Sequence, residues 1–105
     1  FDELQLFIKF ITGWEMTLEE LIKVGERKYN MMRLLNAKEG QTKLNDIPSK
    51  KMFQPLEGGT SDGYVMNEEQ VKNAIDEFYI QRGWNSISGN PTQEKLVELG
   101  LEWVN

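Results

Sequence analysis

Carboxylates that are adjacent in sequence are the first candidates for chemistry in this chain, because two carboxyl groups can act as a general acid and a general base. Two such pairs occur, Glu19–Glu20 and Asp76–Glu77. Both pairs fall in segments with helical periodicity, where adjacent side chains point in different directions and do not converge on one substrate. We therefore interpret all four carboxylates as surface charges.

Two residue types that most catalytic and metal sites need are missing. The chain contains no cysteine and no histidine. This excludes thiolate nucleophiles, Ser–His–Asp triads, zinc fingers and cysteine-ligated iron–sulfur clusters within the chain. The remaining carboxylates do not have the spacing of a calcium-binding loop. We therefore expect no catalytic residue, no metal ligand and no bound cofactor in this chain alone.

A polar stripe is the remaining candidate for a functional surface. Glu26, Arg27, Asn30, Arg33 and Asn36 recur at helical spacing and share one broad helix face. Arginine guanidinium groups can bind carboxylates or backbone carbonyls through two hydrogen bonds, so the stripe could dock another protein domain. The alternative is a solvated face, which is the usual meaning of charges at this spacing. Asn and Arg are less typical of a solvated face than Lys and Glu, but the residues alone favour the solvated face. We favour docking for these five residues only in combination with the family resemblance described below.

Other conspicuous side chains have simpler interpretations. Arg82 and Trp84 flank Gly83, and they could form a cation–π contact or anchor an interface. More often such a pair closes the domain core, and we favour that interpretation for both residues. We also interpret Met31 and Met32 as core residues, in preference to an adaptable binding patch.

Length and charge exclude several classes of function. The 105 residues suit a single domain, residues 1–105, and the formal net charge is −5 with no basic tract. Nucleic acids and anionic membrane surfaces both require clustered basic residues, so neither is an expected partner. The longest apolar stretch, residues 4–11, is too short to span a bilayer and lacks the features of a signal peptide. We expect a cytoplasmic protein.

The polar stripe must be positioned by the longest predicted helix. Thr17 is a typical N-cap residue, and Glu20 three positions later completes a capping box. Helical periodicity continues to about Lys38, and Gly40 is the expected C-terminal stop. A shorter apolar helix precedes this one and ends before Gly13.

Two more helices follow after a long irregular stretch. Asn67 and Thr92 are the expected N-caps, and Gly83 and Gly100 the expected stops. Residues 41–66 are polar and rich in glycine and proline, with no helical or alternating period. The sequence therefore predicts an all-α fold of about four helices, with a long irregular connection between the second and third. The apolar residues expected to hold this connection down are Met52, Phe53, Leu56 and Tyr64.

The first predicted helix is apolar on nearly every side. Its main stripe consists of Leu4, Phe7, Ile8 and Ile11. Phe1, Leu6 and Phe10 lie off this stripe, and such a helix requires cover on more than one face. Because the chain also begins with Phe1 and not Met, we expect it to be a piece of a larger protein. The uncovered face should lead the fragment to self-associate through this helix.

Several short motifs follow one another along the chain. The longest predicted helix reads G-E-R-x-x-N-x-x-R-L-L-N-x-x-E-G from Gly25 to Gly40. The later motifs are Asn45-Asp46-Ile47-Pro48, Tyr79, Arg82-Gly83-Trp84, Pro91-Thr92, and Leu96 with Leu99-Gly100-Leu101. Each motif alone is weak, but their order and spacing over residues 13–101 resemble the C-terminal end of the aldehyde:ferredoxin oxidoreductases.

The resemblance implies a parent enzyme with its own chemistry. Members of that family bind a tungsten or molybdenum pterin cofactor and a [4Fe–4S] cluster, oxidise aldehydes to carboxylic acids and pass the electrons to ferredoxin. They have an N-terminal β-rich domain and helical domains that clasp the cofactor. This chain resembles the last part of the final helical domain. The resemblance implies that the residues holding the cluster and the pterin lie upstream of it.

Two hypotheses about function follow. In the first, the chain is a non-catalytic helical domain of such an oxidoreductase and packs against the cofactor-bearing domains. In the second, it is an independent helical interaction module with no enzymatic activity. The apolar first helix and the motif series favour the first hypothesis.

Overall fold

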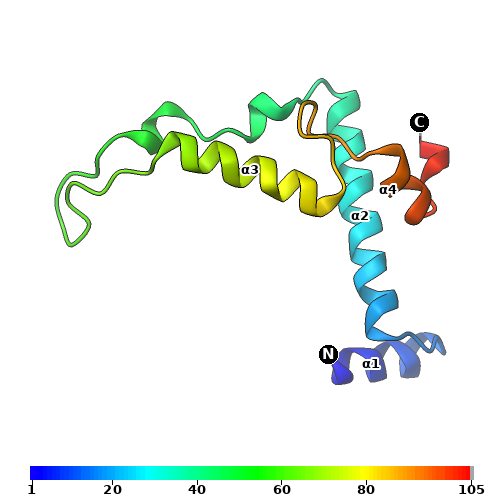
Figure 1. Cartoon of the computed structure of the whole chain (residues 1–105). Coiled ribbons are helices and arrows are strands. Elements are labelled where there is room, and N and C mark those ends of the chain that lie inside the picture. Colours follow the sequence, from blue (N-terminus) through cyan, green and yellow to red (C-terminus); the bar gives the residue numbers. More distant parts are fainter. Residues whose placement is uncertain (105) are drawn as a thin grey trace.

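The computed structural model describes residues 1–104, and its regular elements are helical (Figure 1). Its helices are α1 (Asp2–Thr12), α2 (Leu18–Lys38), α3 (Glu68–Arg82) and α4 (Gln93–Glu98). Short 3₁₀ turns accompany them, namely η1 (Lys43–Asp46), η2 (Lys50–Phe53) and η3 (Glu102–Val104). These residues contain no strand, so the predicted all-α fold with a long connection between the second and third helices is confirmed.

Local capping interactions define where the helices begin and end. The Thr17 hydroxyl accepts a hydrogen bond from the Glu20 N–H at 3.2 Å, and the Glu20 carboxylate accepts one from the Thr17 N–H at 2.7 Å. The side chains of Asn67 and Thr92 cap α3 and α4. Gly83 ends α3 in the left-handed region, at φ 69°. The sequence predictions for these helix ends are confirmed.

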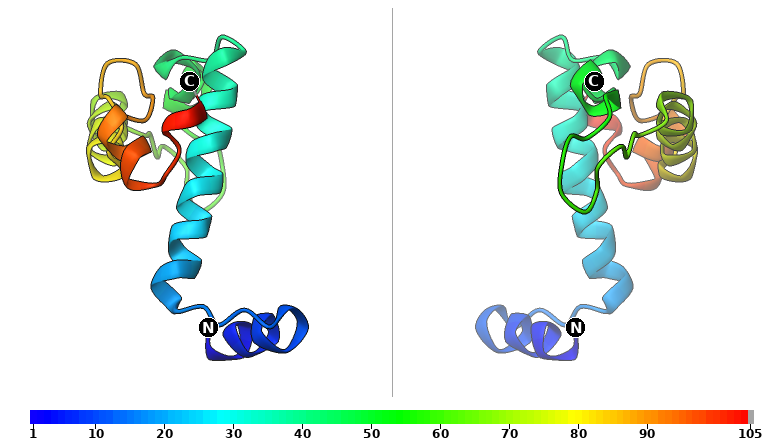
Figure 2. Two further views of the ribbon diagram at one scale, coloured as in Figure 1. Left: turned by 90° about the vertical axis from the view of Figure 1, so that its right-hand side faces the viewer. Right: turned by 90° about the vertical axis from the view of Figure 1, so that its left-hand side faces the viewer.

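Helix α2 is the axis around which the other elements are arranged. Helix α1 lies across its N-terminal end, while α3, α4 and the connection gather near its C-terminal half (Figures 1 and 2). The radius of gyration is 18.7 Å, whereas a compact domain of this length has about 13 Å. The described part of the chain is therefore extended, and much of α2 has no neighbour.

The apolar core is small and lies beside the C-terminal half of α2. Leu96, Leu99 and Leu101 form a buried cluster, and each is at most 3% exposed. Leu34 of α2 and Val104 of η3 pack against this cluster. The core therefore joins one end of α2 to α4 and η3, and leaves α1 outside.

Helix α1 has few contacts with the rest of the chain. The Gln5 amide donates a hydrogen bond to the Met16 carbonyl at 2.9 Å, and Lys9 forms an ion pair with Glu15. The three residues predicted to lie off the main stripe are exposed, and Phe10 reaches 81%. Most of the main stripe is exposed as well. No helix within residues 1–104 is both long and apolar enough to cross a membrane.

The two methionines of α2 were wrongly predicted to lie in the core. Met31 is 41% exposed and Met32 is 53% exposed. Only one face of α2 is covered in this chain, and it is the face that bears Asn30 and Leu34. Helical periodicity identified the apolar positions of α2 but did not distinguish the covered face from the uncovered ones.

Three of the four apolar residues expected to hold the connection between α2 and α3 are exposed, whereas the fourth, Phe53, is half-buried. Met52, Leu56 and Tyr64 are 54%, 52% and 62% exposed. The first part of the connection is anchored through η1, as described below. The later part turns back on itself, with the Leu56 N–H donating to the Tyr64 carbonyl at 2.9 Å, and projects beyond the N-terminal end of α3 (Figure 1).

The first part of the connection is anchored through η1 and the later part projects outward, so we expect two rates of hydrogen exchange within the connection. Amides of residues 55–66 should exchange much faster than those of α3, because few contacts oppose local opening there. Amides of residues 43–47 should be protected to an intermediate degree, because side-chain contacts hold η1. Hydrogen exchange followed by mass spectrometry tests this. Uniform exchange across residues 41–66 would contradict the prediction.

Candidate functional site

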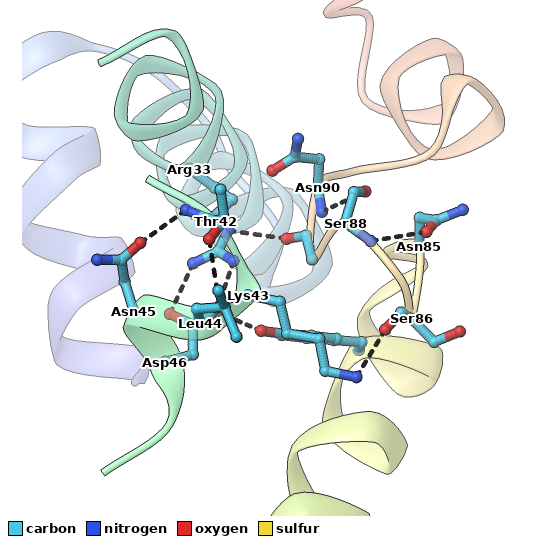
Figure 3. A network of polar contacts seen from close by, with 12 residues as sticks. Arg33, Thr42, Lys43, Leu44, Asn45, Asp46, Asn85, Ser86, Ser88 and Asn90 are labelled. Carbon is cyan, nitrogen blue, oxygen red and sulfur yellow. Dashed lines mark hydrogen bonds and ion pairs between the residues drawn. The ribbon is translucent and has the colours of Figure 1, made fainter. Parts of the chain in front are cut away.

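The Arg33 side chain connects three separate segments of the chain (Figure 3). Its Nη1 and Nη2 donate hydrogen bonds to the two carboxylate oxygens of Asp46 in η1, at 2.9 and 2.5 Å. Its Nε donates to the Gly89 carbonyl, in the loop between α3 and α4, at 2.8 Å. The side chain is 11% exposed. Such a bidentate, charge-assisted pair fixes direction as well as distance.

A tyrosine from α3 completes this arrangement. The Tyr79 hydroxyl donates a hydrogen bond to Asp46, whose carboxylate therefore links α2 to α3. We call Arg33, Asp46, Tyr79 and Gly89 the Arg33 network. All of its charged and polar groups find partners within the chain.

A lysine on the same 3₁₀ turn makes a second link. Lys43 forms an ion pair with Asp76 of α3 and also donates a hydrogen bond to the Ser86 carbonyl at 2.8 Å (Figure 3). The η1 turn is therefore fastened to α2 through Asp46 and to α3 through both of its charged residues. This explains why the first part of the connection lies against the helices.

Beside the Arg33 network lies a cluster of aromatic side chains. Trp84 is 5% exposed, and its indole N–H donates a hydrogen bond at 2.8 Å to the side-chain oxygen of Asn30, which is 3% exposed. Tyr29 stacks on Trp84 with ring centroids 5.5 Å apart. The Arg33 guanidinium lies 5.0 Å from the Trp84 ring centroid, a cation–π distance. The prediction that Trp84 closes the core is confirmed.

Arg82, its neighbour in sequence, remains at the edge of this cluster. Its guanidinium lies 5.5 Å from the Tyr29 ring centroid and 5.1 Å from that of Phe78. Arg82 itself is exposed. The favoured interpretation is therefore wrong for Arg82, which makes the alternative cation–π contact with aromatic rings of α2 and α3.

The loop that contains Gly89 has a shape that lets its backbone lie close to the Arg33 side chain. The Asn85 side-chain oxygen accepts hydrogen bonds from the Ile87 and Ser88 N–H groups at 2.9 and 3.0 Å, which forms a tight turn. Gly89 itself has φ +75°, and a Cβ atom there would lie 2.5 Å from Arg33 Nη2. A glycine is required at this position for two reasons, the left-handed backbone and the space taken by Arg33.

These contacts shift the pKa values of the three titratable members of the network. The hydrogen bonds from Arg33 hold the pKa of Asp46 below its ordinary value, against the opposing effect of burial. The same pairing raises the pKa of Arg33. Burial, assisted by the hydrogen bond to Asp46, raises the pKa of Tyr79 to about 12. At neutral pH the network therefore contains a guanidinium, a carboxylate and a neutral phenol.

The chemistry of this site is structural. The one carboxylate in the Arg33 network is fully engaged by a cation and a phenol, so it is not available as a base. Within residues 1–104 no group of three or more His, Cys, Asp or Glu residues is arranged to hold a metal ion. The geometry joins helices, and it offers no reacting centre.

Comparison with known proteins identifies the family of this helical chain. The family described as "Aldehyde ferredoxin oxidoreductase, domains 2 & 3" matches residues 1–101. The chain belongs to the aldehyde ferredoxin oxidoreductase family. The resemblance found in the motif series is confirmed.

Relatives in the aldehyde ferredoxin oxidoreductase family are much longer than this chain. The tungsten-containing aldehyde ferredoxin oxidoreductase of Pyrococcus abyssi is 33% identical over 103 residues, which cover 96% of this chain and 16% of the relative. The protein of the same name from Pyrococcus horikoshii is 35% identical over 92 residues, 86% of this chain and 14% of the relative. An aliphatic sulfonate oxidoreductase, WOR-like subunit, of Pyrococcus furiosus is 26% identical over 107 residues, 96% of this chain and 17% of the relative. The chain spans about one sixth of their length.

The structure places the five predicted docking residues of this family member in three different environments. Asn30 and Arg33 are turned inward, and their partners lie in the chain itself. Glu26 is half-buried, with its carboxylate 3.8 Å from Lys95 Nζ. Arg27 and Asn36 are exposed. The bidentate chemistry predicted for Arg33 is present, although its partner is a carboxylate of the same chain.

Sequence reasoning did not assign roles to the partners of Arg33. Asp46 and Tyr79 were noticed only as members of the motif series. One signal could have drawn attention to Asp46, since it lies two residues before Pro48 in a non-periodic segment where no helical face explains a carboxylate. Nothing local could have paired it with a tyrosine of another helix.

Two glycine variants test how closely the Gly89 backbone lies to the Arg33 side chain. Gly89 and Gly59 have nearly the same φ, +75° and +74°, but a Cβ on Gly59 would meet no atom within 4 Å. Gly59→Ala should cost about 1 kcal/mol of unfolding free energy for backbone strain alone. Gly89→Ala should cost about 1–3 kcal/mol more, because the methyl group displaces Arg33. Urea unfolding measures both, and equal losses would contradict the close approach.

The pKa shifts predict that stability depends on pH at both extremes. The pKa of Asp46 is lowered by folding, so its contribution is present above the unfolded value of about 3.9 and is lost as pH falls further. The pKa of Tyr79 is raised by folding, so its contribution is present below pH 10 and is lost between pH 10 and about 12.

Thermal unfolding of matched variants isolates the two effects. Asp46→Asn should flatten the acid decline relative to wild type, and Tyr79→Phe should flatten the alkaline decline. Lysine titration contributes equally to wild type and Tyr79→Phe, so it cancels in the comparison. The prediction is wrong if wild type and Tyr79→Phe lose stability with the same slope from pH 10 to about 12.

Proposed function

We propose that this chain is a non-catalytic helical domain of an aldehyde ferredoxin oxidoreductase and packs against the cofactor-bearing domains of that enzyme. The parent is a cytoplasmic enzyme that oxidises aldehydes to carboxylic acids with a tungsten or molybdenum pterin and a [4Fe–4S] cluster, and passes the electrons to ferredoxin. Two relatives carry the name tungsten-containing aldehyde ferredoxin oxidoreductase, which supports this assignment. The chain itself supplies no ligand to either cofactor.

The observation that carries the proposal is the amount of apolar surface left uncovered. Among residues 1–104, five hydrophobic residues are buried, whereas twenty-four large hydrophobic side chains are at least 37% exposed. Single exposed apolar residues are common on soluble proteins, but contiguous apolar patches mark interaction surfaces. An extended chain with this surface is better explained as part of a larger folded protein than as an independent module.

Helix α1 presents one such contiguous patch. Leu6, Phe7, Phe10 and Ile11 line a hollow of about 460 Å³ that has Glu3 at its edge. In the parent enzyme this surface packs against another domain. In the isolated chain the same surface predicts self-association through α1.

The exposed members of the polar stripe add a second docking surface. Arg27 is free to form a bidentate pair with a carboxylate or carbonyl of another domain. Asn36 lies nine residues further along α2 and offers both a donor and an acceptor. With Asn30 and Arg33 engaged within the chain, these two residues carry the docking role that the stripe suggested.

A split version of the parent enzyme tests the proposed function. The parent polypeptide is produced without the segment that corresponds to residues 1–105, and that segment is supplied as a separate tagged chain. We expect the two pieces to co-purify and to recover aldehyde oxidation, while the segment alone contains no stoichiometric tungsten, molybdenum or iron and has no activity. Full activity and metal content in the parent without the segment would contradict the proposal. Metal bound by the segment alone would contradict it as well.

A further inference from the structure

A second groove lies between α2 and η3, away from α1. Met31, Met32 and Leu35 form its floor, and Trp103 of η3 forms part of its wall. The hollow has a volume of about 370 Å³, and its side chains are accessible, with Leu35 60% and Trp103 70% exposed. None of these residues takes part in the Arg33 network.

The walls of this groove are held in place by the core. Val104 packs against the buried leucine cluster, so η3 is fixed beside α2. The Lys38 ammonium donates a hydrogen bond to the Val104 carbonyl at 3.1 Å. The Trp103 indole N–H donates to the Gly100 carbonyl, also at 3.1 Å. The groove is therefore formed before any partner arrives, which reduces the entropy lost on binding.

A lysine lies at each end of the apolar floor. Lys28 and Lys38 also line the groove, and ten residues of helix separate them by about 15 Å. Within residues 1–104 no carboxylate lies within ion-pair distance of either lysine. Four other lysines form ion pairs, namely Lys9, Lys43, Lys72 and Lys95, and it is the position of Lys28 and Lys38 beside the apolar floor that sets them apart from the remaining unpaired lysines. In a chain of net charge −5, an apolar groove with an uncompensated cation at each end is complementary to an acidic amphipathic partner.

We infer that this groove holds an amphipathic helix from another part of the parent polypeptide, with a carboxylate near each end of its apolar stripe. Three turns of helix match the distance between the two lysines, and apolar side chains at helical spacing would fill the floor. Methionines adapt their shape to such a partner. The inference rests on the proposed function, since about five sixths of each relative's length lies outside the matched segment.

Photo-crosslinking in the full-length enzyme tests the occupant. The photoreactive residue p-benzoylphenylalanine replaces Leu35 in the groove, or Ile87, which is 86% exposed on a distant loop, as the control. We expect an intramolecular crosslink from position 35, to a helical peptide with carboxylates flanking apolar residues, and little crosslinking from position 87. A crosslink to a second copy, to a different protein or to a peptide without carboxylates would overturn the inference. So would the absence of any crosslink in an enzyme with normal tungsten content.

Charge reversal tests the role of the lysines. Lys28→Glu in the full-length enzyme should lower the thermal midpoint at low salt, and the difference from wild type should shrink in 1 M salt because the contact is ionic. Lys51→Glu makes the same change of charge on the exposed connection and should have no such effect. Equal behaviour of the two variants would overturn the charge assignment.

The crosslinking and split-enzyme experiments together distinguish a failure of the groove assignment from a failure of the proposed function. If the segment restores aldehyde oxidation to the split enzyme but position 35 does not crosslink to the remainder, the groove assignment alone is wrong. If the segment neither co-purifies with the remainder nor restores activity, the proposed function is wrong as well.

Discussion

The carboxylate–guanidinium pair between Asp46 and Arg33 organises the folded half of this molecule. Arg33 projects from α2 and reaches the connection and the loop after α3 at once, while Asp46 reaches back to Tyr79. The buried apolar cluster joins α2 only to α4 and η3. Helix α3 and the connection are therefore attached mainly by the Arg33 network, the Lys43–Asp76 ion pair and the aromatic cluster around Trp84. Replacing one member would leave a partly buried charge without its partner, which costs more than the pair itself contributes.

The two halves of α2 differ in how much of their surface the rest of the chain covers. One face of the C-terminal half packs against the rest of the chain, and Asn30 and Arg33 on that face find their partners there. The N-terminal half and α1 depend on local capping and leave their apolar side chains exposed. The chain belongs to the aldehyde ferredoxin oxidoreductase family and spans about one sixth of the length of its relatives. The proposed packing against other domains of such an enzyme would cover the exposed surfaces of α1 and α2.

Much of the fold could be predicted from sequence, and the site only in part. Capping residues, glycine stops and helical periodicity located all four helices. The lack of cysteine and histidine led us to expect no catalytic residue, which stays a prediction. The polar stripe was recognised as important, but two of its members face inward. The methionines were placed in the core because an apolar residue at helical spacing does not reveal whether a neighbour covers it.

Interactions between residues close in sequence could be predicted, whereas interactions between residues far apart in sequence could not. A capping box joins residues three positions apart, so Thr17 and Glu20 determine the start of α2 by themselves. Arg33 meets Asp46 across 13 positions, Asp46 meets Tyr79 across 33, and Arg33 meets Gly89 across 56. Local propensity and periodicity carry no information about such pairs, since any exposed carboxylate could satisfy a guanidinium equally well. The sequence by itself determined the helices, their ends and the family. Only the tertiary structure decided which polar residues are paired within the chain and which apolar faces stay exposed, because both depend on which segments come to lie side by side.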